Sequence, residues 1–320
     1  MHKNSFDGFL KFKDSKTFYN KSGRTQHMKR LKLSDIKFKK LISLKKNQQK
    51  RVCVICGSSS YNLLFEKNNF KHVRCKKCEF VYVNPILKQQ VQENALKVES
   101  SYTQVLKNKI NIKLDNLRFK YGLQKINIIK KKKKILDYGC GFGQSLDVAK
   151  KFNWDCSAYE INEQCIEILK KKKIKIDNNF KKDSYDAITM WLVLEHIPDP
   201  NKLIKKIYNS LKNKGKLLIN VPNVNSLTAL LQKDKCTMFA GEQHLNHFSV
   251  KTLSMFLKKN KFKLKFIETV ISDAGTARNF LDYKDPKMGQ SKLRYQFTDV
   301  KYMHKHQLGY TLLAIAEKDE

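Results

Sequence analysis

The chain lacks the features that mark membrane-spanning and secreted proteins. No apolar run approaches the roughly 18 residues that a bilayer span needs, and the longest, AITMWLVL at 187–194, has the length of a strand. No basic start followed by an apolar signal core is present. We therefore expect a cytoplasmic protein without a membrane span. The 8 cysteines are interpreted as metal ligands and buried thiols rather than a disulfide scaffold.

Arginine is scarce although the formal net charge is +36, because the 65 basic residues are 58 Lys and only 7 Arg. Arginine is the residue favoured for bidentate contacts to phosphates and bases. Abundant Lys, Asn and Ile are what an AT-rich coding bias produces. The charge therefore favours a solvated, lysine-rich surface, and nucleic acid is the less favoured partner.

Composition and pattern divide the chain into four segments. A basic N-terminal extension at 1–50 precedes a cysteine-rich unit at 51–85, and a helical linker or cap follows at 86–130 with helices expected at 89–98 and 114–126. From 131 to 320 short apolar strands alternate with helical patterns, which is typical of a parallel α/β sheet. We expect an α/β fold with a Rossmann-like, seven-stranded, mostly parallel sheet, helices on both faces and an antiparallel last hairpin.

The cysteine-rich unit has the spacing of a metal site. Two C-x2-C pairs are separated by 18 residues, and they consist of Cys53, Cys56, Cys75 and Cys78. Each pair can place two thiolates on one tight turn, and Gly57 follows the first pair where such a turn needs a positive φ. Four thiolates suit a tetrahedral zinc ion and leave no open position for substrate. The spacing predicts a small zinc ribbon with a structural Zn.

A glycine-rich turn follows the first strand of the α/β segment. In ILDYGCGFGQ, Asp137 precedes Gly139, Gly141 and Gly143. No Walker sequence is present, and Gln144 stands where a dinucleotide fingerprint needs its third glycine. An acid in front of the turn repels a phosphate and attracts an ammonium or sulfonium cation.

A second acid follows the next expected strand. Glu160 ends CSAYE about 20 residues after the turn, where a carboxylate can accept both hydroxyls of a ribose. A ligand with adenosine at one end and a cation at the other is S-adenosylmethionine (SAM). We also place Cys140, Ile161 and Trp191 at this cofactor.

These motifs resemble those of class I SAM-dependent methyltransferases. ILDYGCGFGQ resembles the first motif of that family, YEIN the second, and YDAITMWLVLEHIPDP the fourth strand with its following loop. More narrowly, the chain is similar to a bacterial group with an N-terminal zinc ribbon that modifies sugars, polysaccharides and other small molecules. The segment after strand three is shorter than is usual there, so Asp177, Asn178 and Phe180 are only candidates for the adenine pocket.

Two clusters of titratable residues are candidates for the acceptor site. Glu195 and His196 follow the fourth strand, at the sheet edge where ligands bind in open parallel sheets. His196 is the first candidate base for removing a hydroxyl proton. The alternative is that Glu195 and His196 only cap the next helix, for which Asp199 also fits.

The second cluster is GEQHLNHFS, with Glu242, His244 and His247 in six residues between strand five and the next helix. Base catalysis, hydrogen bonding to the acceptor and plain loop packing remain open for these side chains. A metal held by His244-x2-His247 is a weaker alternative, and Ser249 is expected to cap the helix that follows.

The expected function is SAM-dependent methylation of a small molecule or glycan, most simply at a hydroxyl. One rival is an RNA methyltransferase that holds the backbone with its ribbon and lysines. Against it, no [DNS]-P-P-[YF] motif follows strand four. A second rival is a non-catalytic SAM-binding or scaffold protein.

Overall fold

The computed structural model describes residues 17, 20–22, 36–91 and 108–319. Most of the predicted basic extension and most of the predicted helix at 89–98 lie outside the described residues. Within the described part, no helix is both long enough and apolar enough to cross a membrane.

A seven-stranded sheet forms the centre of the molecule, in the order β12-β13-β10-β9-β6-β7-β8. Only β13 runs antiparallel to its neighbours β10 and β12. The strands are β6 (Lys133–Tyr138), β7 (Trp154–Tyr159), β8 (Lys175–Ile176), β9 (Tyr185–Trp191), β10 (Leu211–Pro222), β12 (Phe262–Val270) and β13 (Thr311–Lys318). The mostly parallel α/β sheet and the antiparallel last hairpin are confirmed.

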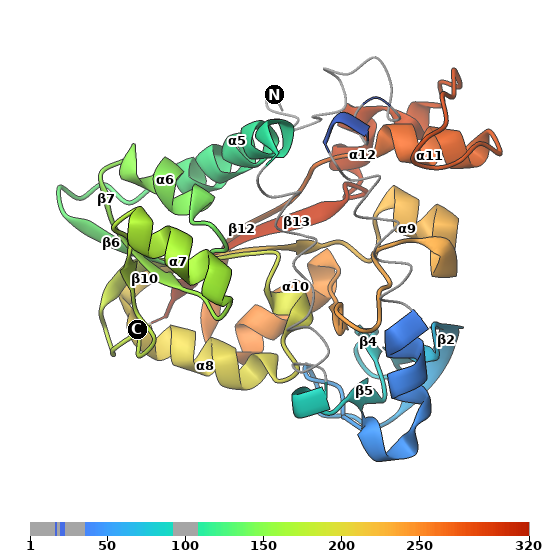
Figure 1. Ribbon diagram of the computed structural model, residues 1–320, viewed down its shortest axis with the longest axis horizontal. Coiled ribbons are helices and arrows are strands. Elements are labelled where there is room, and N and C mark those ends of the chain that lie inside the picture. Colours follow the sequence, from blue (N-terminus) through green and yellow to red (C-terminus); the bar gives the residue numbers. More distant parts are fainter. Residues whose placement is uncertain (1–16, 18–19, 23–35, 92–107, 320) are drawn as a thin grey trace.

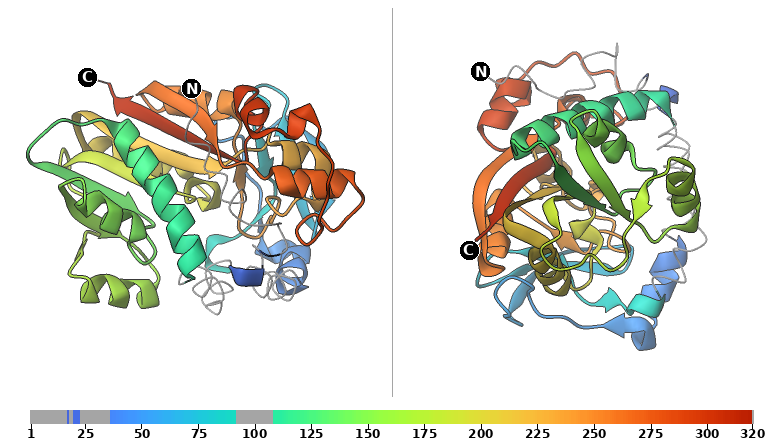
Figure 2. Two further views of the ribbon diagram at one scale, coloured as in Figure 1. Left: turned by 90° about the horizontal axis from the view of Figure 1, so that it is seen from above. Right: turned by 90° about the vertical axis from the view of Figure 1, so that its left-hand side faces the viewer.

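Helices cover both faces of this sheet (Figures 1 and 2). On one face lie α5 (Lys109–Ile126), α6 (Gln144–Lys150) and α7 (Glu163–Lys171), and their apolar side chains form one buried cluster with the strands. On the other face α8 (Pro200–Ser210) and α10 (Val250–Lys259) contribute to a second cluster. The burial of apolar residues on two faces explains why the strand sequences are almost continuously apolar.

The helix starts follow the expected capping chemistry. The Asp199 carboxylate accepts from the backbone N–H of Lys202 at 3.1 Å and caps α8. Ser249 caps α10 through a capping box with Thr252. The N-cap of α8 is therefore Asp199, and neither Glu195 nor His196 occupies that position.

The fourth strand of the sheet ends earlier than its apolar run. β9 stops at Trp191, and Leu192 has a φ of 57°, in the left-handed region that a leucine rarely adopts. The chain then turns into a short 3₁₀ segment, Leu194–His196. This break redirects Glu195 and His196 away from the strand direction at the carboxyl edge of the sheet.

A four-stranded antiparallel sheet joins the cysteine-rich unit to the α/β part, in the order β11-β4-β3-β2. Its strands are β2 (Tyr61–Lys67), β3 (Phe70–Cys75), β4 (Val81–Val83) and β11 (Asn246–His247). β11 comes from the loop after β10, and Phe80 and Tyr82 share a buried cluster with α10. A two-stranded sheet pairs β1 (Gln48–Gln49) with β5 (Ile86–Leu87).

Three short helices complete the end of the molecule near the carboxyl edge of β10. α9 (Leu227–Gln232), α11 (Ala274–Leu281) and α12 (Val300–Lys305) share a small apolar cluster. In Figure 1, α9 lies on the same side as β2, β4 and β5. The cysteine-rich unit therefore sits at the end of the sheet where ligands bind in open α/β folds.

Candidate cofactor and acceptor site

The glycine-rich turn lies between β6 and α6 and is held against the adjacent strand. Gly139, Gly141 and Gly143 have φ values of 73°, 55° and 71°, which only glycine adopts without strain. The Gly139 N–H donates to the Tyr159 carbonyl at 2.8 Å. A Cβ on Gly139 would lie 2.7 Å from Cγ2 of Val193, so any larger residue would push the turn and the end of β9 apart.

The acid after β7 faces the turn. The Glu160 carboxylate accepts from the backbone N–H of Gly141 at 2.8 Å and from those of Ile161 and Asn162 at 2.8 and 2.9 Å. β6 and β7 are adjacent parallel strands, which brings Glu160 beside the turn. Ile161 is 78% exposed, so an apolar surface lies open next to this carboxylate.

Asp137 lies beneath the turn rather than on its surface. Its side chain is 1% exposed and accepts hydrogen bonds from the Ser145 hydroxyl and, at 2.8 Å, from the Thr189 hydroxyl. Burial raises the pKa of the Asp137 carboxyl to about 7, although the two hydroxyl bonds oppose the shift. The carboxyl thus braces β6, α6 and β9 against one another.

This buried acid gives an expected pH dependence of stability. The pKa of Asp137 in the folded protein, about 7, lies above the ordinary value of 3.8, so between these values the folded state holds a proton that the unfolded state has lost. Stability therefore falls as pH rises through this window. Between pH 5 and pH 8 the free energy of unfolding of wild type should fall by up to about 3 kcal/mol more than that of the Asp137→Asn variant. The measurement is urea unfolding at each pH.

The matched control is Asp155→Asn, which removes an exposed carboxyl from the neighbouring strand β7. It should leave the wild-type pH profile unchanged. Parallel profiles for wild type and Asp137→Asn would show that Asp137 does not titrate in this range.

Trp191 at the end of β9 packs under helix α5. Its ring contacts Phe119 edge-to-face at a centroid distance of 4.9 Å, and a Cβ on Gly122 would lie 2.5 Å from it. The indole Nε1 is buried, and no described residue accepts a hydrogen bond from it. Arg118 of the same helix reaches the Asn220 side chain at 3.3 Å. A buried indole N–H and a buried guanidinium thus lie near the carboxyl ends of β9 and β10.

Glu195, His196 and His244 converge beyond the end of β9. The Glu195 carboxylate is 1% exposed and lies 3.9 Å from His196 Nε2. Within the described part of the chain, neither of its oxygens has a hydrogen-bond partner. The rings of His196 and His244 meet edge-to-face at 4.9 Å. Burial raises the pKa of Glu195 to about 8 and lowers that of His244 to about 3, with repulsion from His196 adding to the latter shift.

His247 lies apart from those three residues. It is 2% exposed on β11, and its Nε2 is 3.2 Å from Nδ1 of His72 on β3. Phe65 and Phe239 pack against this pair. Burial holds the His247 pKa well below its ordinary value. Glu242, the remaining predicted member of the cluster, is 2% exposed.

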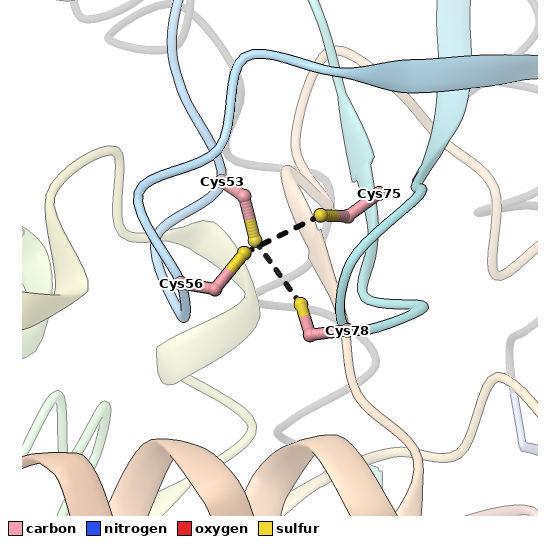
Figure 3. Close-up of side chains that lie close together, drawn as sticks. All are labelled: Cys53, Cys56, Cys75 and Cys78. Atoms are coloured by element: carbon pink, nitrogen blue, oxygen red, sulfur yellow. Dashed lines mark hydrogen bonds between the residues drawn. The ribbon is translucent and has the colours of Figure 1, made fainter.

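The four cysteines of the ribbon meet at one point (Figure 3). Their sulfur atoms all lie within 4.8 Å of one another, with Cys53 and Cys78 at 3.4 Å and Cys56 and Cys75 at 3.5 Å. The Gly57 N–H donates to the Cys53 carbonyl at 2.8 Å, and Gly57 has a φ of 74°. These residues fit a tetrahedral tetrathiolate zinc site, in which the S–S separations are about 3.8 Å.

Sequence reasoning missed His72 and Arg118. His72 occupies an inward-facing position of β3, and its partner His247 is 175 residues away. Arg118 is 7% exposed within the predicted helix. The burial of His72 could have been inferred from the alternation of side chains along a strand, and that of Arg118 from the helical period. Their contacts with His247 and Asn220 depend on tertiary pairing.

The α/β part is similar in sequence to known proteins. Residues 117–265 match a family model described as a methyltransferase domain. Over 124 residues the chain is 30% identical to a ubiquinone biosynthesis O-methyltransferase of Coxiella burnetii, covering 35% of this chain and 52% of that one. An uncharacterized protein of Methanocaldococcus jannaschii is 38% identical over 99 residues, 29% of this chain and 42% of its own. The chain thus spans about half the length of these relatives.

Among solved structures, phosphoethanolamine N-methyltransferase 2 of Haemonchus contortus, in complex with S-adenosyl-L-methionine, has a TM-score of 0.51 at 18% identity. The alignment covers 75% of this chain and 63% of that one, and it supports the fold alone. The family match, the strand order and the glycine turn agree with one another. Residues 117–265 are therefore similar to the methyltransferase domain family, and the chain shares the fold of the Haemonchus contortus enzyme.

Proposed function

We propose that the protein transfers the methyl group of SAM to a hydroxyl of a small molecule or glycan. The observation that carries the proposal is the placement of Glu195, His196 and His244 directly beyond β9, next to the glycine turn that Val193 contacts. A glycine turn suited to the cofactor and two imidazoles able to accept a proton thus share one sheet edge. The O-methyltransferase relative supports a hydroxyl acceptor, although it matches only part of either chain.

In this proposal the cofactor lies along residues 139–143, with Glu160 releasing its backbone contacts to hold the ribose hydroxyls. Trp191, Cys140 and Ile161 line the same site. Asp137 acts from below by fixing the turn through Ser145. The enzyme mainly aligns acceptor and methyl group, since the sulfonium already carries the activation.

The transfer is an in-line displacement. A lone pair of the acceptor oxygen forms a bond to the methyl carbon, and the carbon–sulfur bond breaks with its electrons remaining on sulfur, which leaves S-adenosylhomocysteine. The hydroxyl proton goes to His196. Its Nδ1 donates to the Gln243 carbonyl at 3.0 Å, which leaves a lone pair on Nε2, and burial lowers its pKa so that the ring is neutral near pH 7.

We infer further that Cys53, Cys56, Cys75 and Cys78 hold a structural zinc ion, as in the bacterial methyltransferase group with an N-terminal ribbon. The support is the convergence of the four sulfurs, because four thiolates complete the tetrahedral shell of a structural zinc ion. The ribbon binds the α/β part through β11, and Lys259 and Asn201 both donate to the Val54 carbonyl.

The first experiment is calorimetric titration of the purified protein with SAM and S-adenosylhomocysteine, with and without excess bulk tRNA and rRNA, at two salt concentrations. We expect a dissociation constant in the micromolar range, which corresponds to a binding free energy of about −8 kcal/mol. RNA should leave this value unchanged. Gly139→Ala should abolish binding, because its Cβ would meet Val193. Gly57→Ala has nearly the same φ but open space around it, so it reports the backbone strain alone, without a clash. Because Gly57 adjoins Cys56, zinc content is measured in this variant and must equal that of wild type.

The other outcomes favour the rivals. Tight, salt-dependent RNA association coupled to cofactor binding would favour an RNA methyltransferase. Cofactor binding without methyl transfer to any hydroxyl compound tested would favour a SAM-binding scaffold. Absence of cofactor binding in wild type would contradict the proposed activity altogether.

A further inference from the structure

Three side chains that can bind a metal meet beyond β9. They offer carboxylate oxygen and imidazole nitrogen, unlike the sulfur ligands of the four cysteines. One ligand atom each from Glu195, His196 and His244 lies within 4.8 Å of the other two. The Glu195 Oε1 to His196 Nε2 distance is 3.9 Å. Ligand atoms bound to one zinc ion at about 2.0–2.2 Å lie roughly 3.3–3.5 Å apart. The three ligand atoms are thus somewhat farther apart than they would be around a bound ion, and they would have to move closer together to bind one.

A backbone carbonyl orients the imidazole of His196, and another orients that of His244. Nδ1 of His196 is 3.0 Å from the Gln243 carbonyl, and Nδ1 of His244 is 2.8 Å from the Met238 carbonyl. A carbonyl only accepts, so each Nδ1 carries the proton and each Nε2 keeps a lone pair. Metal-binding histidines characteristically have this outer hydrogen bond, which fixes the ring and its tautomer.

The Glu195 carboxylate is the unexplained member of the cluster. It is 1% exposed, and neither oxygen has a hydrogen-bond partner among the residues that the structure describes. The charge of the buried Arg118 guanidinium favours the ionised carboxylate, and burial opposes that ionisation. A cation bound directly to the carboxylate would supply the contact that its oxygens lack. The 3₁₀ segment after β9 holds Glu195 and His196 side by side, and the Leu245 N–H fixes the Glu195 carbonyl at 2.8 Å.

We propose that Glu195, His196 and His244 form a second metal site, which binds a divalent transition metal such as Zn²⁺ or Fe²⁺ with at least one open coordination position. Two imidazoles and one carboxylate are the ligand set of open zinc and non-haem iron sites. Mg²⁺ prefers an all-oxygen shell and is not expected to bind tightly here.

The role of the open coordination position rests on the proposed methyl transfer. An acceptor hydroxyl bound there loses its proton to solvent more readily, because the metal charge stabilises the alkoxide. The oxygen then attacks the methyl carbon as described above. With a metal present, Nε2 of His196 is a ligand, so it no longer takes the proton itself.

The test measures metal content and needs no acceptor. The purified protein is treated with a mild chelator that strips the nitrogen–oxygen site and leaves a tetrathiolate site filled, and it is then titrated with Zn²⁺, Co²⁺ and Mg²⁺ by calorimetry. We expect one further equivalent of Zn²⁺ or Co²⁺ to bind and Mg²⁺ to give no heat at millimolar concentration. Glu195→Gln and His244→Ala should each weaken Zn²⁺ binding at least 100-fold.

His306→Ala is the matched control, because it removes an exposed imidazole just after α12 and should leave the second equivalent in place. Melting curves and retention of the cysteine-bound zinc show that each variant is folded. No second equivalent in wild type, or undiminished Zn²⁺ binding in both Glu195→Gln and His244→Ala, would overturn the proposal. Metal binding without SAM binding would leave the site intact and contradict only the methyl-transfer function.

Discussion

Replacing Cys56 with serine is expected to abolish binding of the structural zinc and to lower the melting temperature of the whole protein by roughly 10 °C. Cys56 is an exposed residue, whereas Cys53, Cys75 and Cys78 are buried. Without a metal, a Cys-to-Ser change at such a position stays within about 0.5 kcal/mol of wild type. A large effect therefore requires that Cys56 holds an ion.

The loss of stability should extend beyond the ribbon, because the ribbon shares its apolar core with the α/β part. Phe80 and Tyr82 lie in the same buried cluster as Phe256 of α10, and β11 hydrogen-bonds to β4. Loosening the four sulfurs removes the constraint on the turn that precedes β2 and on the end of β3. We expect a destabilisation of roughly 3–5 kcal/mol, a small share of the zinc-binding free energy of about 10–16 kcal/mol seen for structural sites.

Ser59→Ala is the matched control, an exposed substitution three residues along the same loop. Zinc content by elemental analysis and melting by circular dichroism are measured for wild type and both variants. Retention of full zinc content by Cys56→Ser, or a melting temperature equal to that of Ser59→Ala, would contradict a four-cysteine structural site.

Local patterns in the sequence were sufficient to predict much of this fold. The alternation of strands and helices after 131 predicted the sheet, since both faces of a parallel sheet are buried and its strands are apolar throughout. The helix at 114–126 forms the larger part of α5, and Asp199 and Ser249 cap helices as expected. Each of these features depends on residues close together in the chain.

The remaining features depend on residues that are distant in the chain. The pairing of β11 with β4 joins segments more than 160 residues apart, and it brings His247 Nε2 to 3.2 Å from His72 Nδ1. The positive φ of Leu192 ends β9 within an apolar run that reads as one strand. Burial likewise makes Asp137 an internal brace, which the acid-before-glycine pattern alone does not reveal.

The same tertiary contacts place the proposed chemistry at one junction. Helix α5 covers Trp191, the 3₁₀ segment presents Glu195 and His196, and the loop before β11 supplies His244. The ribbon anchors that loop through β11. A structural metal in the ribbon would thus act on the acceptor site indirectly, by holding the loop in register.

Replacing His196 with alanine should lower kcat by about 10²–10⁴-fold and change the dissociation constant of SAM by less than about 3-fold. The ring contacts His244 and lies beside Glu195, while the predicted ribose acid Glu160 belongs to a different strand end. Asp199 caps α8 without help from His196, so the substitution should leave the helix in place. Removing the ring therefore tests chemistry rather than folding.

The measurement is release of S-adenosylhomocysteine with the best acceptor from a screen of phenols and monosaccharides, together with calorimetric titration of SAM. His306→Ala, which removes an exposed imidazole, should match wild type in both. An unchanged kcat would exclude His196 from proton removal and from metal binding during turnover. A lost SAM affinity would instead assign the ring to the cofactor pocket. Restoration of turnover by free imidazole would show that the missing group acts through its nitrogen lone pair, because only that function can be supplied from solution.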